Sequence, residues 1–204
     1  MTTPTVTAPA ALFSRASRAV VTAWARRGTI AVTVTEDSGW TIVHPLVSRA
    51  DAPYDDPVRA LVSRPAAPAM RPAVFLGEVD DRAIVALHPR GLRRRTRYAT
   101  WSPATGRTRM PELPALTAAA LAQAFDLAVT DLAEALETPG RPHQRSTRDW
   151  LLAIRDALAL PVTALTAGRS PLAAETVEPE ENSVRRFNSL LRAARADEEE
   201  GQRR

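Results

Sequence analysis

Arginine is concentrated in one stretch of the chain, RAIVALHPRGLRRRTRYATWSPATGRTR, which covers residues 82–109. No acidic residue occurs between Arg82 and Glu112, and Tyr98 and Trp101 lie among the arginines. Guanidinium groups bind phosphates and aromatic rings stack on bases, so this composition favours contact with a nucleic-acid backbone. The residues expected to make that contact are Arg90, Arg93, Arg94, Arg95, Arg97, Arg107 and Arg109. The alternative is a solvated strand face that pairs with acidic helices later in the chain.

Residues suited to catalysis or metal binding are sparse and scattered. The chain has no cysteine, and its three histidines, His44, His88 and His143, are far apart in the sequence. The aspartate pairs 55–56 and 80–81 fall in expected loops or turns, where aspartate is favoured for backbone hydrogen bonding. No G-x-S-x-G, P-loop or G-x-G-x-x-G pattern occurs. We therefore expect a non-enzymatic protein with no catalytic residue, metal site or cofactor.

The composition is that of a folded chain with a moderate positive charge. Apolar residues make up 45% of the 204 residues, which is enough for a hydrophobic core. All 27 basic residues are arginine and the net charge is +4, which permits a nucleic-acid partner without requiring one. No apolar run reaches the roughly 18 residues that a membrane span needs, and no secretion signal is evident. We expect a cytoplasmic protein.

Hydrophobic periodicity predicts a helix followed by a series of β-hairpins. Apolar residues recur every three or four positions between residues 9 and 27, which is typical of an amphipathic helix. Alternating residues predict strands on either side of the turn EDSG at 36–39. A second hairpin is expected within 73–89, and a third within 96–110 turning at SPATG. Together these segments predict an antiparallel sheet of five or six strands.

The second half of the chain has helical periodicity. LTAAALAQAFDLAVTDLAEALETPGRP, residues 116–142, reads as two short helices capped by Thr117 and Thr130, with a corner at Asp126. A third apolar face follows at Trp150, Leu151, Ile154 and Leu158. Across residues 116–168 these features resemble the helix-turn-helix of the Cro/phage-repressor type, also called the xenobiotic-response-element family. The resemblance rests on Leu116, Thr117, Leu121, Ala122, Phe125, Asp126, Leu127, Asp131, Leu132, Glu137, the PGRP loop and the apolar residues from Leu152 to Leu165. The rest of the chain resembles no family.

This resemblance implies a protein that binds double-stranded DNA and regulates transcription. Thr130 on the recognition helix, and Arg141, Gln144 and Arg145 in the loop after it, would contact the DNA. The outward positions of that helix carry none of the arginine, lysine, asparagine or glutamine side chains that read bases best. We therefore expect the flanking arginines to supply most of the affinity.

The alternative function is that of a protein-interaction or assembly subunit. Residues 110–140 contain five acids and no arginine, so a degenerate helix-turn-helix could bury this acidic face on a partner protein. The tail SVRRFNSLLRAARADEEE reads as an amphipathic helix that docks on a partner or on a second copy of the chain. Its partner-binding residues would be Val184, Phe187, Leu190 and Leu191.

The predicted fold class is α+β. It consists of an N-terminal helix plus an antiparallel β-hairpin sheet, followed by an all-α bundle like a helix-turn-helix and a C-terminal helical tail. The expected segments are a flexible tail at 1–9, the helix and sheet at 10–112, the helical domain at 113–168, an acidic linker at 169–182 and the tail helix at 183–204.

Overall fold

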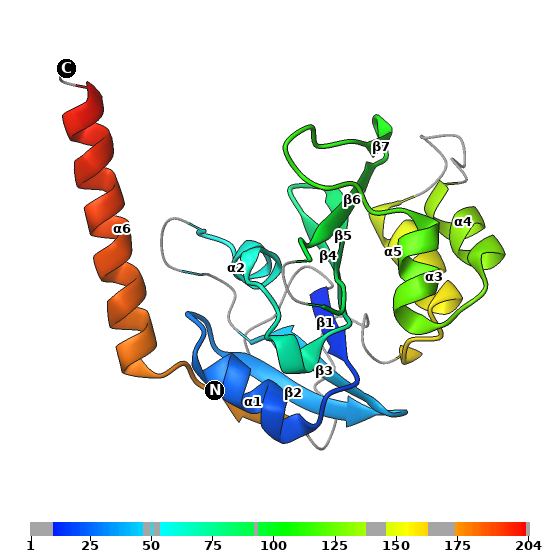
Figure 1. The fold of residues 1–204 in the computed structure, drawn as a ribbon, viewed down its shortest axis with the longest axis horizontal. Helices are drawn as coiled ribbons and strands as arrows, with labels where there is room; N and C mark the ends of the chain where they lie inside the picture. Colours follow the sequence, from blue (N-terminus) through cyan, green and yellow to red (C-terminus); the bar gives the residue numbers. More distant parts are fainter. Residues whose placement is uncertain are drawn as a thin grey trace.

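An antiparallel sheet runs through the middle of the molecule, and helices cover both of its faces (Figure 1). The computed structural model describes residues 10–46, 50, 54–91, 94–137, 146–162 and 174–202. Within these residues eight strands lie in the order β7-β6-β5-β4-β1-β3-β2-β8, and every neighbouring pair is antiparallel.

The strands are β1 (Ala10–Ser14), β2 (Val32–Asp37), β3 (Trp40–Pro45), β4 (Ala73–Val79), β5 (Arg82–His88), β6 (Arg97–Ser102), β7 (Gly106–Thr108) and β8 (Glu175–Val177). The helices are α1 (Arg18–Arg26), α2 (Pro57–Ser63), α3 (Ala118–Phe125), α4 (Val129–Glu137), α5 (Thr147–Ala157) and α6 (Glu181–Gln202), with a short 3-10 helix at Pro68–Met70.

The three predicted hairpins are confirmed, and their turns follow from local chemistry. Ser38 and Gly39 join β2 to β3 with φ angles of 50° and 78°. Asp80 and Asp81 join β4 to β5 with φ angles of 49° and 57°. Two successive left-handed residues give a two-residue turn whose twist matches that of the strands, and glycine and aspartate tolerate this conformation best.

The predicted N-terminal helix is wrong over its first half. Residues 10–14 form β1, which lies between β3 and β4 in the centre of the sheet. Phe13 pairs with Ile42 on one side and Val74 on the other. All five residues of β1 are buried because both faces of the sheet are covered. A short apolar run of this kind suits a fully buried strand as well as a helix, so periodicity alone could not distinguish them. The helix α1 begins only at Arg18.

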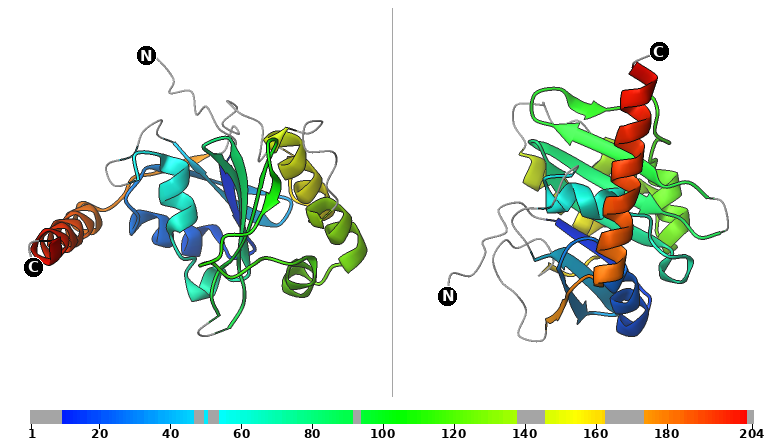
Figure 2. Two further views of the ribbon diagram at one scale, coloured as in Figure 1. Left: turned by 90° about the horizontal axis from the view of Figure 1, so that it is seen from above. Right: turned by 90° about the vertical axis from the view of Figure 1, so that its left-hand side faces the viewer.

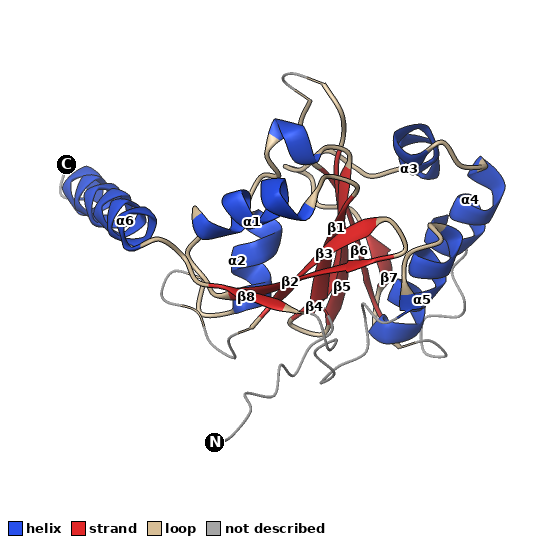
Figure 3. Cartoon of the chain, turned by 90° about the horizontal axis from the view of Figure 1, so that it is seen from below, coloured by secondary structure: helices blue, strands red, loops and turns tan. Residues whose placement is uncertain are grey.

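Each face of the sheet is covered by a different set of helices (Figure 3). α1 and α2 lie on one face, where Leu12 and Phe75 are buried, whereas α3, α4 and α5 lie on the other, where Phe13 and Trp101 are buried. The two faces alternate along each strand, as the pleat requires.

The predicted all-α bundle is therefore wrong. The helices of residues 118–157 form a layer on the sheet, and their apolar stripes share one core with the strands. Trp150 of α5 stacks on Trp101 of β6, and Phe125 of α3 lies against Trp40 of β3. Helical periodicity identifies which side chains are buried, but it does not say whether they pack against helices or a sheet.

The predicted acidic linker at 169–182 contains regular structure. Residues 175–177 form β8, which pairs with β2 at the edge of the sheet. The backbone N–H of Glu180 then donates to the Arg26 carbonyl at 2.7 Å, and α6 begins at the next residue. No described helix combines the length and the apolar composition needed to cross a membrane.

Candidate nucleic-acid interface

Three of the arginines expected to bind nucleic acid line one surface depression beside α3. Arg90 and Arg94 belong to the connection between β5 and β6, and Arg97 is the first residue of β6. The depression has a volume of about 270 Å³. The remaining lining residues are Leu87, Pro89, Ala120, Gln123 and Ala124. The three guanidinium groups thus come together from a segment of only eight residues.

A hydrogen bond joins the two ends of the connection that carries these arginines. His88 ends β5, and its Nδ1 atom shares a hydrogen bond of 3.0 Å with the Oγ1 atom of Thr96, just before β6. Burial, and secondarily the positive charge of Arg71, lowers the pKa of His88 from 6.5 to about 4. The imidazole is therefore neutral near pH 7, so it positions the loop without adding charge.

Arg97 reaches the depression because of strand alternation. It lies on the same face of β6 as Ala99 and Trp101, which is the face that α3, α4 and α5 cover. The outer surface of α3 presents Ala120, Gln123 and Ala124 there. Two of these side chains are alanines, so a large group can approach the helix, and the Gln123 amide can exchange hydrogen bonds with it.

The depression has an uncompensated positive charge within the described part of the chain. No acidic residue lines it, and the side chains of Arg90, Arg94 and Arg97 form no ion pair or hydrogen bond with any described residue. Arg90 and Arg94 are exposed and Arg97 is half-buried. Unpaired guanidinium groups on a partly desolvated surface favour an anion with several oxygens, which their planar donors bind well.

Comparison of the chain with models of protein families, with curated proteins and with solved structures gives no match. The Cro-type resemblance of residues 116–168 therefore stays a prediction.

Arg107 and Arg109 lie apart from the depression. The Arg107 guanidinium donates to the Leu116 carbonyl at 2.6 Å and lies 3.7 Å from a carboxylate oxygen of Glu137. For this residue the structure agrees with the alternative, in which an arginine of the strand pairs with an acidic helix. Arg107 and Arg109 both line another depression, of about 250 Å³, together with Tyr98 and Leu113. Arg95 is exposed and lines neither depression.

The two helices and their corner form as the sequence predicts. The Thr117 side chain accepts a hydrogen bond from the Ala120 N–H at the start of α3. Asp126 ends α3 in the left-handed conformation, with φ 58° and ψ 52°. The predicted cap at Thr130 is wrong, because α4 begins at Val129 and Thr130 lies in its first turn.

The exposed surface of α4 is acidic. Asp131, Glu134 and Glu137 are exposed beside Thr130, and no residue of α4 is basic. These carboxylates would repel a phosphate backbone, so a contact between Thr130 and DNA is unfavourable electrostatically. Four of the other predicted nucleic-acid residues, Arg93, Arg141, Gln144 and Arg145, lie outside the described residues.

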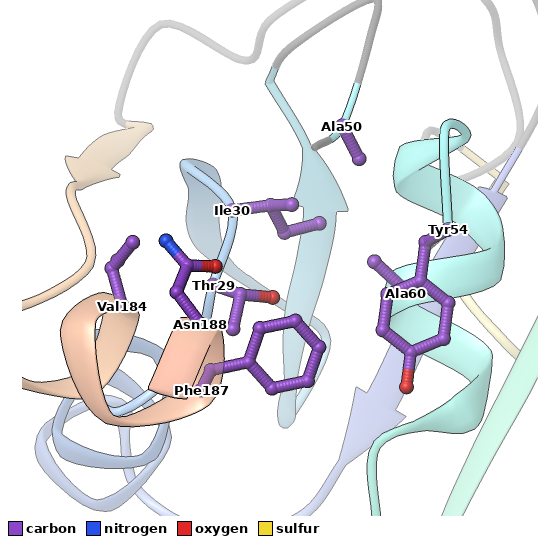
Figure 4. Close-up of a pocket in the computed structure, with 8 residues that line it drawn as sticks. All are labelled: Thr29, Ile30, Ala50, Tyr54, Ala60, Val184, Phe187 and Asn188. Atoms are coloured by element: carbon purple, nitrogen blue, oxygen red, sulfur yellow. The ribbon is translucent and has the colours of Figure 1, made fainter. Parts of the chain in front are cut away.

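The predicted partner-binding residues all lie on α6, but in different environments. Val184 and Phe187 are half-buried, and with Asn188 they line a small cavity against the body of the molecule (Figure 4). The Phe187 ring stacks on Tyr54 with centroids 5.9 Å apart and planes 14° apart. Leu191 is half-buried, whereas 61% of Leu190 is exposed.

Sequence reasoning missed Gln123 and Tyr54. The signal for Gln123 is present in AAALAQAF, where it is the one polar side chain on an alanine-rich outer surface of α3. No local signal identifies Tyr54, because its partner Phe187 is more than a hundred residues further along the chain.

Proposed function

We propose that this protein binds double-stranded DNA without catalysing a reaction, and that the arginine-lined depression beside α3 holds the phosphate backbone. The supporting observation is the convergence of Arg90, Arg94 and Arg97, with no described ion-pair partner, on one surface. The resemblance of residues 116–168 to phage repressors supports a role in transcriptional regulation.

Backbone contacts would account for most of the affinity in this mode of binding. The exposed charged residues of α4 are all acidic, and none of its exposed side chains reads bases well, so α4 would lie away from the phosphates. Gln123 is the one polar residue of α3, and glutamine is a side chain that can read bases. It lines the same depression as the arginines. We expect weak sequence preference and strong salt dependence.

Fluorescence anisotropy with a random-sequence duplex at two salt concentrations tests the proposal. If three phosphates are contacted, the affinity falls about 40-fold between roughly 50 and 200 mM salt because of counterion release. Replacing Arg90, Arg94 and Arg97 together by glutamine should remove most of that salt dependence. The matched control replaces Arg26, Arg27 and Arg82, which lose the same charge from exposed positions outside the depression.

Two results would overturn the proposal. One is the absence of binding at the lower salt concentration. The other is an equal loss of affinity in the depression variant and in the control, because equal losses would mean that net charge alone attracts the DNA.

A second candidate function, assembly with another protein chain, is supported by α6. Its apolar side chains include Leu190, which is 61% exposed, and the helix leaves the body after its first turns (Figure 2). This function predicts a stable complex whether or not DNA binds.

A further inference from the structure

Among the described side chains, those of α6 that contact the body lie in the first turns of the helix. The Glu180 N–H donates to the Arg26 carbonyl, and Phe187 stacks on Tyr54 about two helical turns later. Beyond this point the helix stands apart from the sheet and its covering helices and extends alongside the body, as two perpendicular views show (Figures 1 and 2). Its 22 residues span ~33 Å, so more than half of this length lies beyond the Phe187 contact.

A projecting helix needs a packing partner for lasting stability. Isolated helices are marginal in water, and most of their stability in proteins comes from burying an apolar face. Phe187, Leu190, Leu191 and Ala194 recur at spacings of three and four residues, which places them along one side of α6. Of these four, Leu190 and Ala194 are exposed. The helix therefore carries an apolar stripe that the body covers only at one end.

The charges of α6 are divided between its two halves. Positions 185, 186, 192 and 195 are arginines, and no acid occurs from 182 to 196. Positions 197–200 read Asp-Glu-Glu-Glu, and the backbone stays helical to Gln202. Arg185, Arg186 and Arg192 are exposed and form no ion pair with a described residue. One half of the helix thus complements the charge of the other.

We propose that α6 is a homodimerisation helix that pairs antiparallel with α6 of a second copy of the chain. Antiparallel pairing sets the basic half of each helix beside the acidic half of the other, whereas parallel pairing would set like charges together. The apolar stripes then meet at the centre, with Leu191 of one copy opposite Ala194 of the other.

Sedimentation velocity across a concentration series tests the association. The wild-type protein should form a dimer that weakens as salt rises, because exposed charges are screened. Leu190→Glu should weaken the dimer at least about tenfold, since burying a leucine contributes more than the 1.4 kcal/mol that a tenfold change represents. The matched control is Val162→Glu, at an apolar residue that is 65% exposed and lies outside α6.

Charge reversal tests the complementarity. Replacing Arg185 and Arg186 by glutamate should dissociate the dimer at low salt, because in this register they lie opposite the acidic residues 199 and 200. Adding Glu199→Arg and Glu200→Arg in the same chain should restore it, because the facing residues are again opposite in sign. Circular dichroism of the two variants separates pairing from folding, because the helical content should be the same in both if the charges act between chains.

Engineered cysteines test the orientation, since the chain has none of its own. Antiparallel pairing brings position 190 of one copy near position 197 of the other. A mixture of Leu190→Cys and Asp197→Cys proteins should therefore form mixed disulfides in preference to disulfides between identical chains. A protein that stays monomeric at every concentration, or one that crosslinks only between identical positions, would overturn the proposal. If the protein stays monomeric, the exposed apolar side of α6 would instead bind a different partner protein.

Discussion

The indole rings of Trp101 on β6 and Trp150 on α5 stack with their centroids 6.3 Å apart and their planes 14° apart. This contact joins the helical layer to the sheet, and Trp150 is 1% exposed. Replacing Trp150 by alanine should lower the free energy of unfolding by about 3–5 kcal/mol, and replacing it by phenylalanine by less. Urea denaturation followed by circular dichroism measures both values. Because the helices share the core of the sheet, we expect a single transition, and separate unfolding of helices and strands would contradict this arrangement.

A substitution at Asp126, the left-handed residue between α3 and α4, should stabilise the protein. Asp126 has φ 58°, a conformation that disfavours residues with a Cβ atom by roughly 1 kcal/mol. Asp126→Gly should therefore raise the free energy of unfolding by about 0.5–1 kcal/mol, whereas Asp126→Val should lower it. Thermal denaturation of the two variants compares them. If glycine destabilises the protein, the aspartate side chain contributes more than its backbone conformation costs.

His88 should make stability depend on pH. Its pKa is lowered from 6.5 to about 4, so the unfolded chain takes up a proton in a pH range where the folded protein does not. The free energy of unfolding is therefore highest above pH 6.5 and falls as the pH drops towards 4, by up to about 3 kcal/mol. The pKa of His44 is also lowered, mainly by burial, and acts in the same direction.

Comparing wild type with His88→Gln isolates the contribution of His88, because His44 titrates in both proteins. Chemical denaturation at pH 7, 6, 5 and about 4 should give a flatter pH dependence for the variant. Parallel curves would mean that the His88 imidazole is as easily protonated in the folded protein as in the unfolded chain.

Arg64 should stabilise the end of α1. Its guanidinium lies 3.9 Å from the centre of the Trp24 ring and donates to the carbonyl oxygens of Trp24 and Ala25 in the last turn of that helix. Arg64→Ala should cost about 1–3 kcal/mol, since a cation–π contact and charged hydrogen bonds are lost together. Arg64→Lys should recover part of the loss, because a lysine keeps the charge but not the planar donors. Equal losses in the two variants would assign the effect to the planar group.

Local sequence chemistry predicts much of this fold, and long-range packing accounts for what it misses. Turn residues such as Asp80 and Gly39 determine the backbone conformation only locally, so the hairpins can be predicted from the sequence. The place of β1 depends on strands that lie tens of residues away, and its apolar residues fit a buried helix equally well.

In the candidate interface, too, local sequence identifies the region and long-range packing determines which residues come together. The density of arginine in residues 82–109 identifies the region, but not which side chains act together. Arg97 lines the depression because α3 lies over its face of β6, whereas Arg107 lies on β7 and contacts the Leu116 carbonyl and Glu137. Both relationships depend on the helical layer packing on the sheet, which the sequence does not reveal.

The central position of β1 also affects the order in which the protein can assemble during synthesis. β1 leaves the ribosome before both of its partners, and β4 begins only at residue 73. The hairpins on either side can form from neighbouring segments as they emerge, but the two halves of the sheet have no other strand between them. One edge of β1 can pair with β3 once residue 45 is free, but the other edge stays unpaired until β4 ends at residue 79. In that interval this edge is open to pairing with other chains.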